Sequence, residues 1–138
     1  MSSSRRNIDV LEKISDYCIQ IQNARKRFGD TLEALKTDND YKNAVAMCIL
    51  QIGELTTLLS DEFKAVYSDM PWQDIKRMRN IAAHRYGEFD VEVLWGTVSD
   101  DIPALENYCN TIIGQYHAMQ QEAGEEPDPE MDVEMKME

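Results

Sequence analysis

The sequence predicts an all-α protein: an antiparallel four-helix bundle with short extra helices and a kinked last helix. Three observations favour this fold class. Apolar residues recur at spacings of three, four and seven, which is the pattern of amphipathic helices. No strand signal stands out beside that pattern. The connections between the helical stretches are short, and short connections place consecutive helices antiparallel.

The first helix is predicted to be long. One of its faces carries an apolar stripe that consists of Ile8, Leu11, Ile14, Cys18, Ile21 and Phe28. Gly29 follows and is predicted to end the helix, because glycine adopts the backbone conformations that close a helix. Residues 30–39 are rich in turn-forming residues and are predicted to connect the first helix to the second.

The second helix is predicted to begin at a cap formed by Asp40. Its apolar positions reach nearly around the helix and are Tyr41, Ala44, Val45, Ala46, Met47, Cys48, Ile49, Leu50, Ile52, Leu55 and Leu59. A helix that is apolar on most sides either lies at the centre of the bundle or buries a second face against another subunit. Both alternatives are open at this point. Gly53 would permit a close helix approach, at a cost of about 1 kcal/mol relative to alanine.

Two shorter signals precede the third main helix. Ser60 and Asp61 can start a brief helix. Pro71 is well placed at a first helical position, because its missing N–H would have no helical partner there. We expect the third main helix to run from there to about Tyr86, with Gly87 as its C-terminal stop.

The last helix is predicted to be capped by Asp90, with Phe89 and Leu94 as a hydrophobic staple around the cap. An apolar stripe then repeats at three and four residues. Pro103 lies within this stripe and should kink or break the helix, because proline removes a backbone donor.

The helical pattern stops after Gln121, and the rest of the chain is acidic and contains Pro127 and Pro129. We therefore predict a helical domain over residues 1–121 and a disordered acidic tail over residues 122–138. No apolar run approaches the roughly 20 residues that a membrane helix needs. The start of the chain lacks the apolar core of a signal peptide. A cytoplasmic protein is expected.

The three cysteines are far apart, and each occupies an apolar position of the helical pattern: Cys18, Cys48 and Cys109. No Cys-x-x-Cys pair or neighbouring histidine suggests a zinc site. We expect buried free thiols in a reducing compartment.

The formal net charge of −12 argues against a general nucleic-acid coat, but the charge is unevenly distributed. Residues 122–138 contain eight acids and one lysine, a net charge of −7, so the other 121 residues carry −5. Basic residues cluster at residues 25–27 and again from Lys76 to Arg85, with no acid between those two. A local positive site is compatible with this balance. The tail is interpreted as a solubilising extension, and the alternative is that it folds over the basic site as a nucleic-acid mimic.

Polar donors crowd into the last two turns of the third helix, at Arg79, Asn80, His84, Arg85 and Tyr86. One interpretation is structural, because cations near a helix C-terminus complement its dipole. The other interpretation is chemical. Attack of a ribose 2′-OH on its own phosphate needs proton transfer and a cation that stabilises the phosphorane, and it needs no metal. His84 titrates near neutral pH, and Arg79 offers a planar fork of donors to phosphate.

The spacing of these residues sets a constraint. Asn80 and His84 are four apart and share a helix face, whereas Arg79 and His84 lie roughly 140° apart around the axis. The chemistry needs an acid and a base, and each chain supplies one histidine here. A two-fold dimer that brings two copies of this helix end together would supply both. The wide apolar surface of the second helix is the candidate contact.

The pattern Arg79-x4-His84-x-Tyr86 resembles the Arg-x4-His-x-Tyr motif of the HepT-like proteins of the HEPN superfamily. The similarity covers roughly residues 6–118 and includes further short pieces: Ile52-Gly53-Glu54, Pro71-Trp72, Arg79-Asn80, Leu94-Trp95 and Ile102-Pro103-x-Leu105. Many relatives carry an acid between the motif histidine and tyrosine, and here that position is Arg85. We expect this difference to strengthen phosphate binding and to alter the contact with a protein partner.

The resemblance implies an activity. HepT-like proteins are metal-independent endoribonucleases that need no cofactor and act as the toxin of a type VII-like toxin–antitoxin pair. Arg79 and His84 would then be catalytic, and Asn80 would support them. The other cations of the basic cluster are the expected RNA contacts: Lys76, Arg77 and Arg85.

The resemblance also implies partners. The antitoxin is a minimal nucleotidyltransferase, which in some members of the family transfers AMP to the motif tyrosine, here Tyr86. A bulky anionic group two residues from His84 would block RNA and neutralise the positive site. A homodimer and an RNA substrate complete the expected assembly.

Two other functions stay open. The first is a non-catalytic HEPN module that binds a nucleotide or a nucleotidyltransferase, and the second is a bundle that only dimerises. The intact set of Arg79, His84 and Tyr86 favours the enzyme, because a module that only binds has no need of it. The acidic net charge favours the binding module.

Four residues outside the motif receive structural interpretations. His117 is expected at the surface near the end of the last helix. Glu54 either pairs with an arginine inside the bundle or orients a motif residue, and the structural role is favoured because a buried acid needs a partner. Trp72 and Trp95 are expected in the core or at its rim rather than as platforms that stack on RNA bases.

Overall fold

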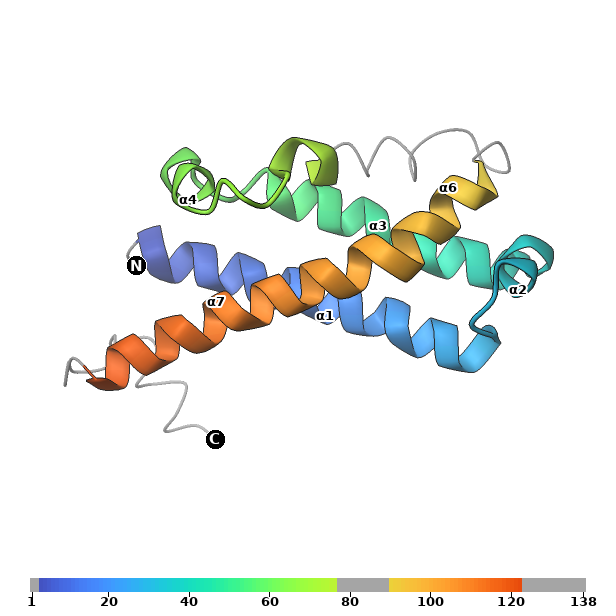
Figure 1. Cartoon of the computed structure of the whole chain (residues 1–138), viewed down its shortest axis with the longest axis horizontal. Helices are drawn as coiled ribbons and strands as arrows, with labels where there is room; N and C mark the ends of the chain where they lie inside the picture. Colours follow the sequence, from blue (N-terminus) through green and yellow to red (C-terminus); the bar gives the residue numbers. More distant parts are fainter. Residues whose placement is uncertain (1–2, 77–89, 123–138) are drawn as a thin grey trace.

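The computed structural model describes residues 3–76 and 90–122, and the regular elements in these ranges are all helical. In chain order they are α1 (Ser3–Phe28), α2 (Leu32–Thr37), α3 (Asn39–Thr56), α4 (Asp61–Val66), α6 (Val91–Gly96), the π-helical turn η1 (Thr97–Asp101) and α7 (Ile102–Glu122). The long helices α1, α3 and α7 run along the length of the molecule, and α1 packs against both others (Figure 1). The predicted all-α bundle is confirmed.

Gly29 ends α1 as predicted. Its φ of +121° lies in a region that other residues rarely adopt, and a Cβ placed there would lie 2.9 Å from the Cβ of Ala34. The last turn of α1 carries Arg25, Lys26 and Arg27. Cations at this position complement the negative end of the helix dipole.

The prediction of a turn-rich connection over residues 30–39 is wrong, because the short helix α2 forms there. Thr31 caps it by accepting a hydrogen bond from the backbone N–H of Ala34 at 3.1 Å. The predicted cap of α3 is also wrong by two residues. Asp38, not Asp40, has extended backbone, and its carboxylate accepts from the N–H groups of Asp40 at 2.9 Å and Tyr41 at 3.2 Å.

Ser60 caps α4 as predicted, because its hydroxyl accepts from the N–H of Phe63 at 3.1 Å. Ser60 also connects α4 to α1 through hydrogen bonds with Asn7. The Asn7 side-chain amide donates to the Ser60 hydroxyl, and the Asn7 carbonyl oxygen accepts from the Ser60 N–H, each at 3.1 Å. Pro71 precedes the next helical turn by one residue instead of opening it, and its carbonyl accepts from the N–H of Ile75 at 3.1 Å.

Asp90 caps α6 as predicted: its carboxylate accepts from the N–H of Glu92 at 3.0 Å and of Val93 at 3.4 Å. The predicted irregularity around Pro103 takes the form of η1, in which the N–H of Ile102 donates to the carbonyl of Thr97. Proline has no N–H for the carbonyl four residues earlier, so a widened turn at this point is expected. Phe89, the other half of the predicted staple, lies outside the described residues.

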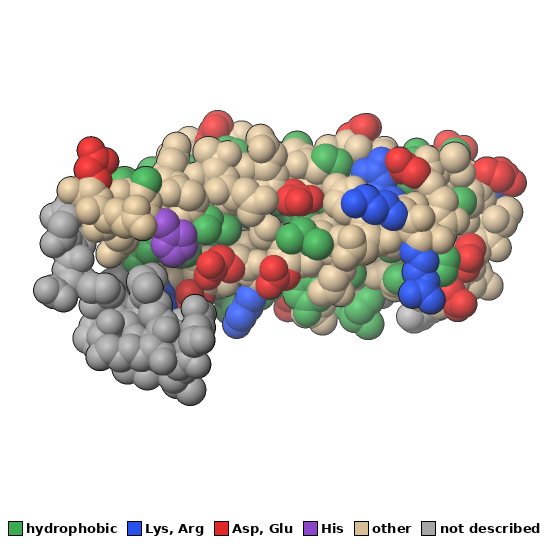
Figure 2. Space-filling view, turned by 90° about the horizontal axis from the view of Figure 1, so that it is seen from below, with side chains coloured by type: hydrophobic (Ala, Val, Ile, Leu, Met, Phe, Trp, Pro, Cys, Tyr) green, Lys and Arg blue, Asp and Glu red, His purple; other side chains and the backbone are tan. Residues whose placement is uncertain are grey.

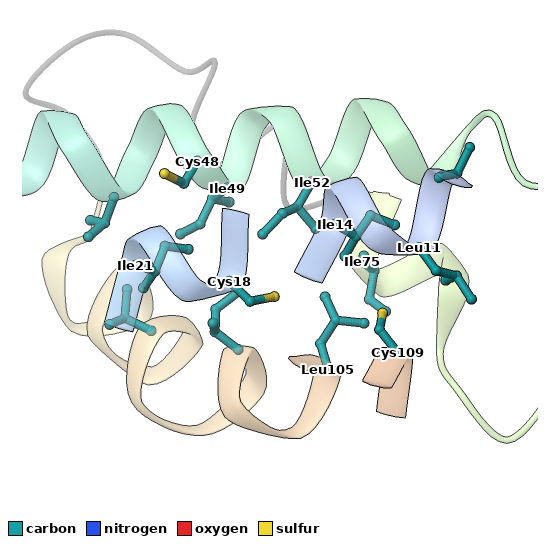
Figure 3. Close-up of a cluster of buried hydrophobic side chains, with 14 of the residues drawn as sticks. Leu11, Ile14, Cys18, Ile21, Cys48, Ile49, Ile52, Ile75, Leu105 and Cys109 are labelled. Atoms are coloured by element: carbon teal, nitrogen blue, oxygen red, sulfur yellow. The ribbon is translucent and has the colours of Figure 1, made fainter. Parts of the chain in front are cut away.

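The core lies between α1, α3 and α7, and Figure 3 shows its central side chains. The fully buried large side chains include Leu11, Ile14, Ile21, Ile49, Ile52 and Leu105. Apolar burial of this kind is the main term that stabilises a bundle. Among the helices of the described ranges, none combines the length and the apolar character needed to cross a membrane.

The three cysteines are buried and free, as predicted. Burial raises the pKa of Cys48 to about 11 and, together with Glu106, the pKa of Cys109 to about 12. Burial raises the pKa of Cys18 further still. The thiols are therefore protonated at neutral pH and behave as small apolar side chains.

Helix α3 is not buried on all sides. Val45, Ile49 and Ile52 face the core and are inaccessible to solvent. Met47, by contrast, is 52% exposed, and Leu58, just past the end of the helix, is 59% exposed. Within the described residues, α3 therefore packs one face in the core and leaves an apolar side chain exposed at Met47.

Candidate active site

The residues predicted to carry the chemistry fall almost entirely in one segment. Residues 77–89 lie outside the described ranges, and this segment contains Arg77, Arg79, Asn80, His84, Arg85 and Tyr86. Lys76 is the one predicted RNA contact that the structure describes, and its side chain is partly buried. The structure therefore defines the segments on either side of the motif, up to residue 76 and from residue 90, and we call these segments its frame.

The frame before the motif is an aromatic cluster. Trp72 is 6% exposed, and its indole N–H donates to the carbonyl of Tyr67 at 2.9 Å. Its ring centroid lies 5.8 Å from that of Phe63 and 6.2 Å from that of Tyr108. Ile75 is 3% exposed and joins the core beside Leu11 and Cys109 (Figure 3). Trp72 and Ile75 thus fix the helical turn that leads into the motif, and the prediction that Trp72 is a core residue is confirmed.

The loop before this turn is fastened to α7. The hydroxyl of Tyr108 donates a short hydrogen bond to the carboxylate of Asp69. Burial, this hydrogen bond and the charge of Asp69 together raise the pKa of Tyr108 well above its usual range. The phenol therefore stays protonated and can hold the loop over residues 67–70 in place.

The frame after the motif is α6. The cap at Asp90 fixes its first turn, and Leu94 is fully buried. Trp95 is partly buried, and the guanidinium of Arg25 lies 5.6 Å from the centroid of its ring. The prediction that Trp95 lies at the rim of the core is confirmed. The chain is thus held again only four residues after Tyr86.

Arg25 has a structural role that the sequence did not reveal. Its Nε donates to the carboxylate of Asp30 at 2.7 Å, and its Nη1 donates to the side chain of Gln22 at 2.9 Å and to the carbonyl of Val98 at 3.5 Å. These bonds, with the contact to Trp95, join the end of α1 to α6 and η1. In the sequence this arginine belongs to a basic cluster, but here it is committed to protein contacts.

Three acids gather at the helical turn over residues 72–76, which precedes the motif segment, and sequence analysis missed them as well. Burial first, then the charges of Asp100 and Asp74, raise the pKa of Asp101. Asp74 precedes Lys76 by two residues, whereas Asp100 and Asp101 belong to η1. No local pattern relates residues 74 and 101, so only the fold brings their charges together.

Two further predictions can be compared with the structure. Glu54 is exposed, so its interpretation as a buried acid is wrong. Its neighbour Gly53 is buried on α3. His117 is partly buried on α7. Burial raises the pKa of Glu12 on α1, and the charge of His117 opposes this shift.

Within the described part of the chain, no group of three or more histidine, cysteine or acidic side chains is arranged to hold a metal ion.

The sequence is similar to those of known proteins. A family model described as "Ribonuclease HepT-like" matches residues 9–112. The chain is 32% identical over 102 residues to "Probable ribonuclease HepT" of Thermococcus cleftensis, which covers 74% of this chain and 91% of the relative. It is 34% identical over 85 residues to "Putative RNase TTE0752" of Caldanaerobacter subterraneus subsp. tengcongensis, covering 62% and 76% of the two chains. No solved structure matches it. The chain therefore belongs to the HepT-like ribonuclease family of the HEPN superfamily.

Proposed function

We propose that this protein is an endoribonuclease that cleaves RNA without a metal ion, with Arg79 and His84 as catalytic residues and Asn80 as their support. The observation that carries this assignment is the ribonuclease-family match, which runs from residue 9 to residue 112 and so includes the whole motif. The structure supports it indirectly, because both ends of the motif segment are held by buried side chains and a helix cap.

The proposed reaction is an internal transfer of the phosphate. The 2′-oxygen forms a bond to the adjacent phosphorus while the bond from phosphorus to the 5′-oxygen of the next nucleotide breaks. One histidine takes the proton of the 2′-OH, and a protonated histidine gives a proton to the leaving 5′-oxygen. Arg79 stabilises the negative charge that builds up on the phosphorane oxygens. The products are a 2′,3′-cyclic phosphate and a free 5′-OH.

RNA binding is assigned to the cations that flank the catalytic pair: Lys76, Arg77 and Arg85. Each would contact the phosphate backbone, which carries no sequence information by itself. The acids Asp74 and Asp101 near the start of the motif helix would limit how far the RNA follows the protein surface in that direction.

A homodimer would complete the site, because the reaction uses an acid and a base and each chain supplies one histidine in the motif. The apolar surface at Met47 and Leu58 favours this assembly. Both side chains are more than half exposed although they are large and apolar, and exposed apolar residues of this kind are common at interfaces. We assign this surface, on and just past α3, as the dimer contact.

In the cell, we assign the protein to the cytoplasm as the toxin of a type VII-like toxin–antitoxin pair. The antitoxin would be a minimal nucleotidyltransferase. Attack of the Tyr86 hydroxyl oxygen on the α-phosphorus of ATP would release pyrophosphate and leave AMP on the tyrosine. The added negative charge and bulk would exclude RNA from the neighbouring His84.

A second candidate function is a HEPN module that binds a nucleotide or a nucleotidyltransferase without cleaving RNA. The observation that favours it is charge. The chain carries a net charge of −12, and the gathered acids at Asp74, Asp100 and Asp101 lie next to the start of the motif helix. Both features oppose the approach of a long polyanion.

An RNA cleavage assay in the presence of EDTA separates the two functions. The wild-type protein is compared with His84→Ala at equal purity, and the intact mass of each protein shows whether Tyr86 carries AMP. Cleavage by the unmodified wild type alone supports the ribonuclease. Absence of cleavage by both proteins, with an unmodified mass, would instead favour the binding module.

A further inference from the structure

A groove of about 340 Å³ lies at one end of the molecule, and its lining shares Phe63 and Tyr67 with the aromatic cluster before the motif. The first turns of α1, helix α4 and the second half of α7 line it, and Figure 1 shows these three segments at the same end of the bundle. Its apolar lining includes Ile8, Phe63, Val66, Tyr67, Tyr116 and Met119.

Two side chains in this groove are unusually exposed for their type. Val66 on α4 is 74% exposed, and Met119 on α7 is 67% exposed. They contribute to the same lining, although 53 residues separate them in the sequence. Exposed apolar residues that converge on one hollow from two elements mark a binding surface more often than scattered ones do.

The C-terminal end of the chain has a matching pattern. Over residues 131–138, apolar and charged residues alternate strictly, with Met131, Val133, Met135 and Met137 at the apolar positions. In an extended chain, alternate side chains point to the same side, so these four would form one apolar face. Methionine adapts its shape to irregular apolar surfaces and is common at such contacts. A tail that served only for solubility would not need this face.

We propose that residues 131–138 of the same chain bind in this groove, with the four apolar side chains directed inward and the charged ones outward. The chain leaves α7 at Glu122, three residues past Met119, so the tail begins at the groove itself. Residues 123–130 can span up to about 26 Å. The groove flank from Ile112 to Met119 is only about 10 Å long, because a helix rises about 1.5 Å per residue. The linker is thus long enough to turn back.

Because the tail is covalently joined to the helical domain, even a low affinity of the tail for the groove is sufficient to keep it bound most of the time. A segment joined by a short linker experiences an effective concentration on the order of millimolar. An isolated tail peptide that binds with a Kd of about 100 μM would therefore occupy the groove in roughly nine chains of ten.

The charges of the groove are mixed. Glu62 is the charged residue in the described lining, and the lining residues have both cations (Arg6, Lys64) and acids (Asp9, Asp61) as direct sequence neighbours. The apolar face therefore supplies the affinity, and the outward acids contribute little. This feature separates groove binding from the alternative in which the tail acts as a nucleic-acid mimic over the basic site, where the acids would supply the affinity.

Methyl NMR of the methionines in the full-length protein tests this directly. The comparison is between the wild type, a variant with Met131, Val133, Met135 and Met137 replaced by Ser, and a variant with Asp132→Asn, Glu134→Gln and Glu138→Gln. The methyl signal of Met119 should move by more than its linewidth in the Ser variant and stay in place in the charge variant. The methyl signal of Met47, which lies on α3, should not move in either variant.

Groove variants provide the reverse test, with the tail left intact. Val66→Lys should shift the tail methionine signals to the position of a free methionine, whereas Val93→Lys, at a 49% exposed position on α6, should not. These shifts should persist unchanged on tenfold dilution.

Three outcomes would overturn the inference. A Met119 signal that is the same in the wild type and the Ser variant would mean that the tail does not occupy the groove. A signal that moves only in the charge variant would place the tail on a basic surface instead. Signals that change on dilution would identify a second copy of the chain as the occupant.

Discussion

At the scale of single residues, backbone conformation and burial make two positions sensitive to substitution. Gly29 has a φ of +121° and no room for a Cβ beside Ala34. Asp101 carries a charge that its surroundings disfavour, because burial and two neighbouring acids raise its pKa. We expect substitutions at both positions to change the stability of the fold.

Replacing Gly29 by alanine should destabilise the protein by about 1–3 kcal/mol, because alanine is strained at this φ and would meet Ala34. Gly114→Ala is the matched control. Gly114 lies in α7 with open space around its Cα, and alanine there should stabilise the helix by about 0.5–1 kcal/mol. Urea denaturation of the two variants measures both effects. Equal stability of the two variants would contradict the conformation at Gly29.

Asp101→Asn should stabilise the protein at about pH 7, and the gain should fade as the pH falls. The folded pKa of Asp101 is raised, so the ionised carboxylate opposes folding above that pKa, and protonation relieves the cost below it. Urea midpoints of the variant and the wild type, measured at about pH 7 and about pH 3, test this sign. A variant that is less stable at about pH 7 would show that the carboxylate has a stabilising partner.

At the scale of elements, helix caps define where the described helices begin, and the cap of α3 is the clearest correction to the sequence. Asp38 accepts hydrogen bonds from two backbone N–H groups, whereas Asp40 lies inside the first turn. A cap satisfies donors that have no partner within the helix.

Asp38→Ala should therefore cost about 1 kcal/mol of stability, and Asp40→Ala clearly less. Both variants remove one negative charge near the start of the same helix, so the difference between them isolates the hydrogen bonds. Thermal unfolding monitored by circular dichroism is a sufficient measurement. A larger loss for Asp40→Ala would restore the cap that the sequence predicted.

The success of the sequence predictions follows from how local each signal is. Gly29, Ser60 and Asp90 each end or start a helix through contacts within four residues, and all three were predicted correctly. Helix α2 was missed because its six residues are too few to show a helical period.

Contacts between segments that are far apart in the sequence leave no local sequence signal. The cation of Arg25 over Trp95, the acids at Asp74 and Asp101, and the groove between α4 and α7 each join residues that only the fold brings together. The motif itself was identified from the sequence because Arg79, His84 and Tyr86 all lie within eight consecutive residues, and residues 77–89 stay a matter of prediction.

At the scale of the whole molecule, the described structure is a bundle with an apolar surface that is not covered within one chain. Met47 and Leu58 are 52% and 59% exposed, and the proposed reaction needs two histidines where each chain supplies one in the motif. In the proposed dimer, this surface would bring the two motif histidines into one assembly.

The double variant Met47→Asp and Leu58→Asp should convert a dimer to monomers, because two buried charges at a two-fold contact are repeated in both subunits. Loss of about 2 kcal/mol per subunit would raise the dissociation constant by roughly a thousandfold in total. Light scattering after gel filtration measures the mass, and the RNA assay measures activity. Val66→Asp, at an exposed position on α4, is the control that should remain dimeric.

Full ribonuclease activity in a monomeric double variant would separate catalysis from assembly. It would mean that a single chain supplies both proton-transfer groups. A wild-type protein that is already monomeric would remove the assignment of the apolar surface to a dimer.

The most direct test of the central claim is the chemistry of the cleaved ends. A short RNA is incubated in EDTA with the wild type, His84→Ala and, as a matched control, His117→Ala, and the products are identified by mass spectrometry. The proposed mechanism predicts 2′,3′-cyclic phosphate and 5′-OH ends from the wild type and His117→Ala, and intact RNA with His84→Ala. Cleavage that persists in His84→Ala, or that leaves 3′-OH ends, would contradict it.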